Sequence, residues 1–142
     1  MDVTVAPSWA YTLQLPHDPR AAGIARSTVR AVLRSHAMPG PADTAELLAS
    51  ELVANAYRHA YGPCALRLRA VAADRVRVGV WDTNPAIPAP FGGETAAPGA
   101  APDAEDGRGL ILVRLCADRY GSYRLDGAHA GKLLWVECGP RR

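Results

Sequence analysis

The sequence lacks any apolar run of about 18 residues, the length that a membrane-spanning helix needs. Residues 1–7 also lack the basic stretch and apolar core of a secretion signal. The three cysteines, Cys64, Cys116 and Cys138, show no Cys-x-x-Cys spacing, so we expect reduced, packed thiols and neither a zinc site nor disulfides. We therefore expect a cytoplasmic protein that has no membrane contact.

An excess of charge of one sign is missing as well. The net charge is +2 over 142 residues and the arginines are scattered, which is too mild to predict nucleic-acid binding. Only one of the 16 basic residues is a lysine, Lys132, and we attribute this bias to coding base composition and to no function. The 49% hydrophobic content and the length predict one ordinary globular domain spanning 1–142.

The most informative stretch runs from residue 51 to residue 60. With ~100° per residue on a helix, small and apolar residues form one stripe, and Glu51, Asn55 and His59 form a second stripe along its edge. A carboxylate and a carboxamide on a half-buried edge suit Mg²⁺ and an attacking hydroxyl. We interpret this edge as a site, with His59 only in a supporting position. The alternative is a solvated Glu51 paired with Arg58 or another arginine.

Two further segments support a binding site. In the strand that ends at Asp82, this acid has the same parity as three inward-facing valines. Its carboxylate is therefore placed to accept a hydrogen bond from the exocyclic amine of a bound base. The alternative is that Asp82 caps a turn through Asn84. Downstream, Gly107-Arg108-Gly109-Leu110 opens an apolar helical run, where close backbone N–H groups and a helix N-terminus suit phosphates. These glycines could instead serve tight packing, and Arg108 could face phosphate or water.

In this order, the three segments resemble the N, G1 and G2 boxes of the GHKL ATPase superfamily, which includes histidine kinases, the gyrase B subunit, heat-shock chaperones and anti-sigma-factor kinases. Glu51 and Asn55 fall on the N box, Asp82 on the adenine-binding acid of the G1 box, and Gly107 and Gly109 on the G2 glycines. The resemblance covers about residues 8–139, which we take as the core of the domain.

The resemblance implies an α+β fold of the Bergerat type, a two-layer sandwich with a mixed, mostly antiparallel sheet and helices on one face. It also implies ATP and Mg²⁺ as cofactors, with Glu51 as the catalytic residue and Asn55 as the metal ligand. The residues that it places around the nucleotide are Asn55, Asp82, Asn84, Gly107, Arg108, Gly109 and Leu110.

Without dimerisation and phosphoacceptor helices ahead of it, the chain looks most like the serine/threonine kinases that act as anti-sigma factors in transcription regulation. The resemblance then implies phosphoryl transfer from ATP to a protein partner, a sigma factor or an anti-anti-sigma-like protein, with a homodimer left open. The alternative is a catalytically weak, nucleotide-gated binding module that sequesters a transcription regulator.

The sequence departs from the family pattern at two places. Asn84 stands where many members have glycine, and asparagine tolerates positive φ better than most residues. The lid, about residues 83–106, is rich in Pro, Ala and Gly and has no basic residue. We expect this segment to be mobile without ligand, because it offers few side chains able to form a core.

Periodicity predicts the remaining elements. In the first half of the chain we expect a strand over residues 9–15, a helix that Asp18 caps and that continues to His36, and a second helix from about Ala42 to His59. Two antiparallel strands that end at Ala72 and Asp82 should follow. After the lid we expect a helix from about Arg108 to Ala117 and a hairpin of residues 120–125 and 132–138 that turns at Asp126-Gly127.

Overall fold

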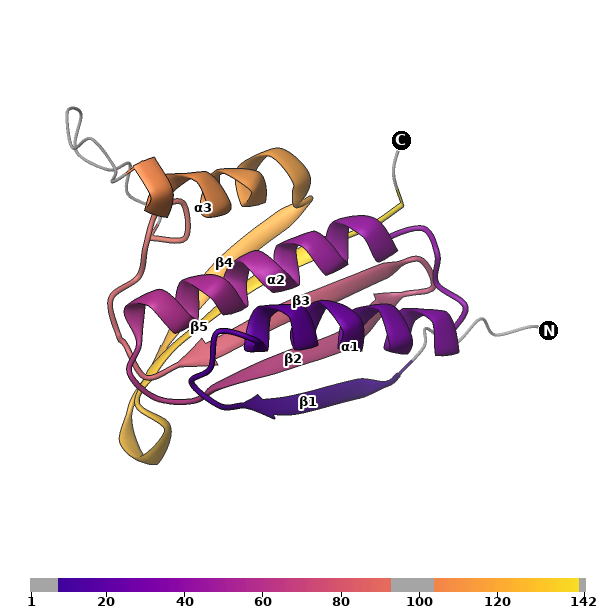
Figure 1. Cartoon of the computed structure of the whole chain (residues 1–142). Helices are drawn as coiled ribbons and strands as arrows, with labels where there is room; N and C mark the ends of the chain where they lie inside the picture. Colours follow the sequence, from indigo (N-terminus) through magenta and orange to yellow (C-terminus); the bar gives the residue numbers. More distant parts are fainter. Residues whose placement is uncertain (1–7, 93–103, 141–142) are drawn as a thin grey trace.

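The structure, a computed structural model, describes residues 8–92 and 104–140, and the side chains of residues 104–109 lie outside that description. The described residues form five strands, three α-helices and one short 3₁₀ turn (Figure 1). In chain order these are β1 (Ala10–Leu15), α1 (Ala21–Ser35), α2 (Ala42–His59), β2 (Cys64–Ala72), β3 (Arg75–Asp82), α3 (Ala104–Cys116), β4 (Arg119–Leu125), η1 (Gly127–His129) and β5 (Gly131–Cys138).

Helix α1 begins later than the cap at Asp18 predicts. The Asp18 carboxylate accepts the Arg20 backbone N–H at 2.8 Å and pairs with the Arg20 guanidinium. It therefore closes a turn at Pro19 and Arg20, and the regular helix starts at Ala21. The helix buries one face against α2, and the partly exposed Arg30 donates to the buried Glu46 of α2 at 2.7 Å. This pair fixes the two helices side by side.

Helix α2 has the bounds that its periodicity predicts, Ala42–His59. All members of the predicted apolar stripe are buried, and these are Ala45, Leu48, Ala49, Leu52, Ala56 and Ala60. The stripe lies on the sheet side of the helix, so the neighbouring edge that carries Glu51 and Asn55 faces the end of the sheet and the segment that follows β3.

The sheet has the order β1-β2-β3-β5-β4, and each of its four strand pairings is antiparallel. The α+β sandwich is confirmed, but the expectation of a mixed sheet is wrong for the described strands. Helix α3 carries the chain back so that β4 runs in the same direction as β3. Strand β5 then fills the place between them and runs antiparallel to both. The sequence pattern could not show this insertion, because it sets no order of strands.

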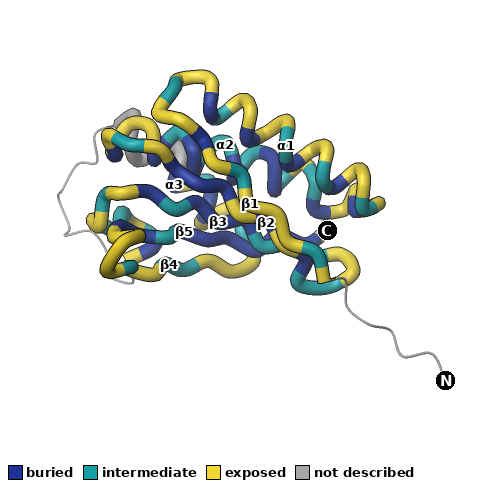
Figure 2. The backbone as a smooth tube through the Cα atoms, turned by 90° about the horizontal axis from the view of Figure 1, so that it is seen from below, coloured by how far each residue is buried: buried dark blue, intermediate teal, exposed yellow. Residues whose placement is uncertain are grey.

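The helices lie on one face of the sheet, and the other face is open (Figure 1). Inward-facing residues of β2, β3 and β5 form the core with the apolar stripes of α1 and α2. Figure 2 shows the buried stretches along the central strands, whereas the edge strands β1 and β4 are largely exposed. Among the described residues, no helix combines the length and apolarity needed to cross a bilayer.

Candidate nucleotide site

The candidate site lies where the C-terminal end of α2 meets the end of β3 and the start of β5 (Figure 1). A pocket of about 150 Å³ opens there, lined by Asn55, His59, Asn84, Ala86, Ile87, Pro88 and Lys132. Small-molecule pockets usually measure about 300–1,000 Å³, so this space holds a fragment of a nucleotide and not the whole molecule. Residues 93–103, the middle of the predicted lid, lie outside the described chain.

Asn55 is the polar side chain that α2 buries at this pocket. It is 2% exposed and lines the pocket, and its carboxamide forms no hydrogen bond within the described residues. Buried polar side chains in folded proteins nearly always have a partner. Trp9 Nε1 is the one fully buried side-chain nitrogen or oxygen without a partner among the described residues, so the Asn55 carboxamide is open to the pocket, where a ligand can reach it. The N box resemblance predicts such a contact.

Glu51 lies one turn before Asn55 on the same edge of α2, and it is half buried. In the part of the chain that the structure describes, no hydrogen bond or ion pair involves Glu51. An ion pair with Arg58 or another arginine, the structural alternative, is thus not found. Glu51 does not line the small pocket itself. A group that is one helical turn away suits a reaction at the far end of a nucleotide better than contact with its base.

Asp82 faces the core side of β3, as its parity predicts, and is 1% exposed. Its Oδ1 accepts the Asn84 backbone N–H at 2.8 Å and the Lys132 ammonium at 2.9 Å. The Asn84 turn, which was the structural alternative for Asp82, is therefore real. Oδ2 takes no part in either bond. Fixing one oxygen leaves the other as the acceptor for a bound base.

Lys132 is a pocket residue that the sequence interpretation missed. It is 1% exposed, lies opposite Asp82 in the β3–β5 register, lines the pocket and also donates to the Asn84 carbonyl at 2.8 Å. The sequence interpretation considered only the scarcity of lysine and did not single out this position, although a buried lysine is costly unless it is paired. A signal was present, since Lys132 has the parity of the inward-facing Leu134 and Val136 on β5.

Gly131 allows this pairing because β5 begins in close contact with the end of β3. Its φ is +146°, and a Cβ placed there would lie 1.9 Å from the Asp82 carbonyl oxygen. No side chain fits at that distance, so only glycine lets Lys132 reach Asp82 from the next strand.

Asn84 does not need the positive φ that its comparison with glycine predicts. Ala37 is the only residue other than glycine with positive φ in the described chain. The Asn84 side chain instead donates to the His59 carbonyl at 2.7 Å and accepts the Ala86 N–H at 3.0 Å. Asparagine thereby joins the end of β3 to the end of α2. Asp82 itself does not line the pocket and is linked to it through Lys132 and Asn84.

A comparison with known families fits this geometry. The family described as histidine kinase-like ATPase domain matches residues 15–137 of the chain. The chain belongs to this family. It is therefore an ATP-binding domain of the histidine kinase-like type. The assignment of Asn55 to the N box and of Asp82 to the G1 box stays a prediction, and both residues are buried. No curated protein matches the chain in a sequence search.

Histidine kinase-like ATPase domains use Mg²⁺ with ATP, and the residues present fit that metal. Asn55 and Glu51 offer hard oxygen donors on one edge of α2, and the Asn55 oxygen has no described partner. No group of three His, Cys, Asp or Glu residues gathers in the described ranges. Mg²⁺ does not require such a group, because it commonly takes one or two protein ligands together with phosphates and water.

The helix that follows the lid begins earlier than predicted. Helix α3 starts at Ala104, so Gly107, Arg108 and Gly109 lie within its first turns and not at its N-terminus. Two glycines cost a helix about 1 kcal/mol each, which is little against the packing of Leu110 and Val113 in the core. The side chain of Arg108 lies outside the described part. The phosphate contacts expected of this ATPase segment stay a prediction.

The first part of the lid packs against the core, although its composition predicts few side chains able to do so. Phe91 is 5% exposed in the core, and Ile87 packs against the same cluster. The Ser122 hydroxyl donates to the Phe91 carbonyl at 3.1 Å, and the Phe91 and Tyr120 rings meet edge to face. The prediction weighed the Pro, Ala and Gly composition of the segment and did not consider the core contact of its single phenylalanine, Phe91. Within the predicted lid, residues 84–92 thus include core contacts and residues 104–106 belong to α3. The predicted mobility of the lid stays a prediction.

The pKa of the Cys64 thiol is raised by its surroundings, which include Asp82. Burial, and after it the negative charge of Asp82, raises the pKa of this thiol to about 11. Burial also raises the pKa of Cys138 to about 12. All three cysteines are unpaired, which confirms the expected reduced thiols. These pKa values mark the two buried thiols as packing groups without nucleophilic reactivity near neutral pH.

Proposed function

We propose that the chain binds Mg²⁺ and ATP at the Asn55 and Asp82 site and transfers the terminal phosphoryl group to a serine or threonine of a partner protein that regulates transcription. The observation that carries this proposal is the carboxamide of the buried residue Asn55, which borders the pocket one helical turn from Glu51. Neither side chain has a hydrogen-bond partner among the described residues. In an ATPase family domain, this pair suits reaction chemistry better than it suits folding.

Each residue has a separate task in this proposal. Asp82 Oδ2 accepts a hydrogen bond from the adenine amine, while Lys132 and the Asn84 N–H donate to Oδ1. Asn55 holds Mg²⁺, which supplies positive charge against the phosphates. Glu51 orients the partner hydroxyl and accepts its proton. The hydroxyl oxygen forms a bond to the γ-phosphorus, and the bond from that phosphorus to the β,γ-bridging oxygen breaks, so that ADP leaves with the electron pair.

The partner class in this proposal is a sigma factor or an anti-anti-sigma-like protein, as the resemblance to anti-sigma-factor kinases implies. A protein that carries the accepting hydroxyl must reach Glu51 from the outer side of α2. The half-buried state of Glu51 leaves its carboxylate accessible to such a hydroxyl. Positioning and electrostatics then supply most of the rate enhancement.

One observation favours a second function, a nucleotide-gated module that sequesters a transcription regulator without chemistry. Lys132, the buried cation at the pocket, is already bound to Asp82 and to the Asn84 carbonyl. The predicted lid, residues 83–106, also contains no basic residue to stabilise the transferred phosphoryl group. In this case ATP binds and changes the affinity for the partner, but Glu51 has no chemical task.

The test incubates purified protein with γ-labelled ATP, Mg²⁺ and candidate anti-anti-sigma-like proteins. We expect Glu51→Gln to keep nucleotide affinity and to lower transfer by about 10²–10⁴, the range of a lost general base. Asn55→Ala should weaken Mg²⁺-dependent binding. The exposed Asp43→Asn, an acid in the first turn of the same helix, is the matched control and should change neither.

Full transfer by Glu51→Gln would remove Glu51 from the catalytic task. ATP binding without transfer to any candidate, together with a nucleotide-dependent change in partner affinity, would select the sequestering module. Failure of both Asn55→Ala and the parent to bind Mg²⁺ and ATP would overturn the two functions together.

A further inference from the structure

The sheet face opposite the helices carries basic residues that the nucleotide site does not use. The strand register places Ala10, Arg69, Arg77, Glu137 and Arg119 side by side across the five strands. Arg67 lies on the same face two residues from Arg69. Four arginines and one glutamate give this face a net charge of +3, more than the +2 of the whole chain. The positive charge of the protein is therefore concentrated on its uncovered side.

The arginines on this face differ in their partners. Arg77 pairs with the buried Glu137, its Nε donating to Oε2 at 2.8 Å, so its charge is largely neutralised. Arg67 and Arg69 are exposed and make no ion pair or hydrogen bond with any described residue. These two guanidinium groups are consequently available to an external anionic group.

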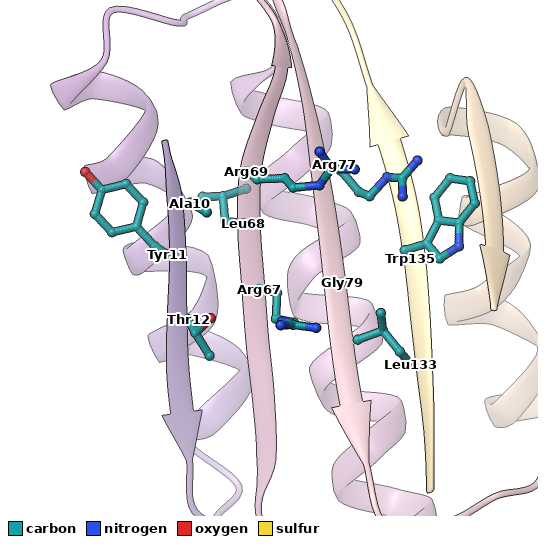
Figure 3. Close-up of a pocket in the computed structure, with 10 residues that line it drawn as sticks. All are labelled: Ala10, Tyr11, Thr12, Arg67, Leu68, Arg69, Arg77, Gly79, Leu133 and Trp135. Carbon is teal, nitrogen blue, oxygen red and sulfur yellow. The ribbon is translucent and has the colours of Figure 1, made fainter. Parts of the chain in front are cut away.

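A hollow of about 290 Å³ lies between these guanidinium groups and the indole of Trp135 (Figure 3). Gly79 forms its floor, because the strand has no side chain at that position. The indole packs over Gly121, where an added Cβ would lie 2.6 Å from Cζ2, and the Arg77 Cζ lies 4.0 Å from the ring centroid. The indole is therefore held toward β4, and Leu133 is the side chain nearest to Gly79.

We propose that this basic face, defined by Arg67, Arg69, Arg77, Gly79 and Trp135, is a docking surface for an acidic segment of a partner protein. Carboxylates of the segment pair with Arg67 and Arg69, and one apolar side chain enters the hollow above Gly79 against Leu133 and Trp135. The surface lies on the opposite side of the sheet from the helix that contributes Asn55 (Figure 1), so docking leaves the nucleotide pocket open.

Charge complementarity selects this occupant. A second copy of the chain would bring its own net charge of +3 against the same face, and like charges oppose such a dimer. A nucleic acid needs many phosphate contacts, whereas the whole chain has a net charge of only +2. An acidic segment with an apolar residue suits both the two guanidinium groups that have no partner among the described residues and the apolar wall of the hollow.

The test pans a displayed library of random 12-residue peptides against the purified full chain and measures the selected peptides by fluorescence anisotropy. The test variant is Arg67→Glu/Arg69→Glu. The matched control is Arg34→Glu/Arg114→Glu, which makes the same charge change at two exposed arginines on helices. We expect acidic peptides to be enriched, and their affinity to fall at least about tenfold in the test variant and less than about threefold in the control. Circular dichroism checks the folding of each variant, and Arg67→Gln/Arg69→Gln replaces the test variant if it unfolds.

A second variant tests the hollow by itself. A Cβ at Gly79 would meet Leu133 Cδ1 at 3.5 Å, an ordinary contact, so Gly79→Val should fold and fill the floor. We expect it to weaken peptides that carry the apolar residue and to leave unchanged their versions with alanine at that position.

Three results would overturn the proposal. The first is selected peptides without net negative charge, or equal losses in the two double variants. The second is a single-stranded oligonucleotide that binds more tightly than the peptides and depends on Arg67 and Arg69, which would assign the face to nucleic acid. The third is self-association in sedimentation that the test variant abolishes, which would assign the face to a second copy. These readouts measure binding alone, so their failure is distinguishable from failure of phosphoryl transfer.

Discussion

Replacing Lys132 by methionine removes the ammonium from a buried ion pair and keeps the length of the side chain. Both partners are 1% exposed, and Lys132 Nζ lies 2.9 Å from Asp82 Oδ1. Breaking such a pair leaves a buried carboxylate with the Asn84 N–H as its remaining bond to Oδ1. Removing one partner of a buried pair costs about 3–5 kcal/mol. We expect Lys132→Met to lower the free energy of unfolding by that amount.

Urea denaturation followed by tryptophan fluorescence measures this loss. With a urea m-value of about 2 kcal/mol/M, the midpoint should fall by about 2 M. That is a large part of the roughly 5–15 kcal/mol that a domain of this kind has. The matched control is Arg124→Met, which removes a cation from the exposed residue directly opposite Lys132 on β4 and should cost less than about 0.5 kcal/mol.

The double variant Asp82→Asn/Lys132→Met separates the ion pair from packing. Neither charge is then buried alone, so the double variant should lose at least about 2 kcal/mol less than the two single losses added together. If Lys132→Met unfolds at the same urea concentration as Arg124→Met, the pair contributes nothing and the reasoning is refuted. Additive single losses would show that packing, and not charge, explains the effect.

The remaining predictions address the base, the lid and the thiols. Asp82→Ala should weaken adenine nucleotide binding by about 1–3 kcal/mol in calorimetry, and unchanged affinity would show that the adenine site is misplaced. Phe91→Ala should destabilise the fold by about 3 kcal/mol in urea, whereas a loss under about 1 kcal/mol would show a loose lid segment. Cys64 and Cys138, with raised pKa values of about 11 and 12, should resist iodoacetamide at pH 8 in the native state and react after unfolding. Because folding raises the pKa of both thiols above the unfolded value of 9.0, their contribution to stability is complete below pH 9 and declines as the pH rises toward 11. Alkaline denaturation measures this decline. Rapid labelling of the native thiols, or a stability that does not change at alkaline pH, would contradict the burial argument.

The helix that carries the N box residues shows what the spacing of apolar residues can predict. The spacing of apolar residues predicted α2 with its observed bounds and the edge that carries Glu51 and Asn55, because a straight helix with one buried stripe is a local pattern. Strand parity likewise predicted the burial of Asp82. These features follow from the period of one element.

Predictions failed where the outcome depended on contacts between elements. The start of α3 moved to Ala104 because the packing of Leu110 and Val113 outweighs the helix cost of two glycines. The composition of the lid predicted few side chains able to pack in the core, yet Phe91 finds a place in the core between elements that the sequence separates. Asn84 was compared with glycine by its backbone freedom, and its actual contribution is a hydrogen bond to the end of α2.

The sequence by itself determined the helix and strand types and the α+β class, because periodicity acts over a few residues. Only the tertiary structure decided that β5 lies between β3 and β4, and this order brings Lys132 opposite Asp82. The same order aligns the arginines of β2 and β3 with Glu137 and Trp135 on the open face. Residues that are 50 or more positions apart meet only through strand order, and no local pattern encodes that order.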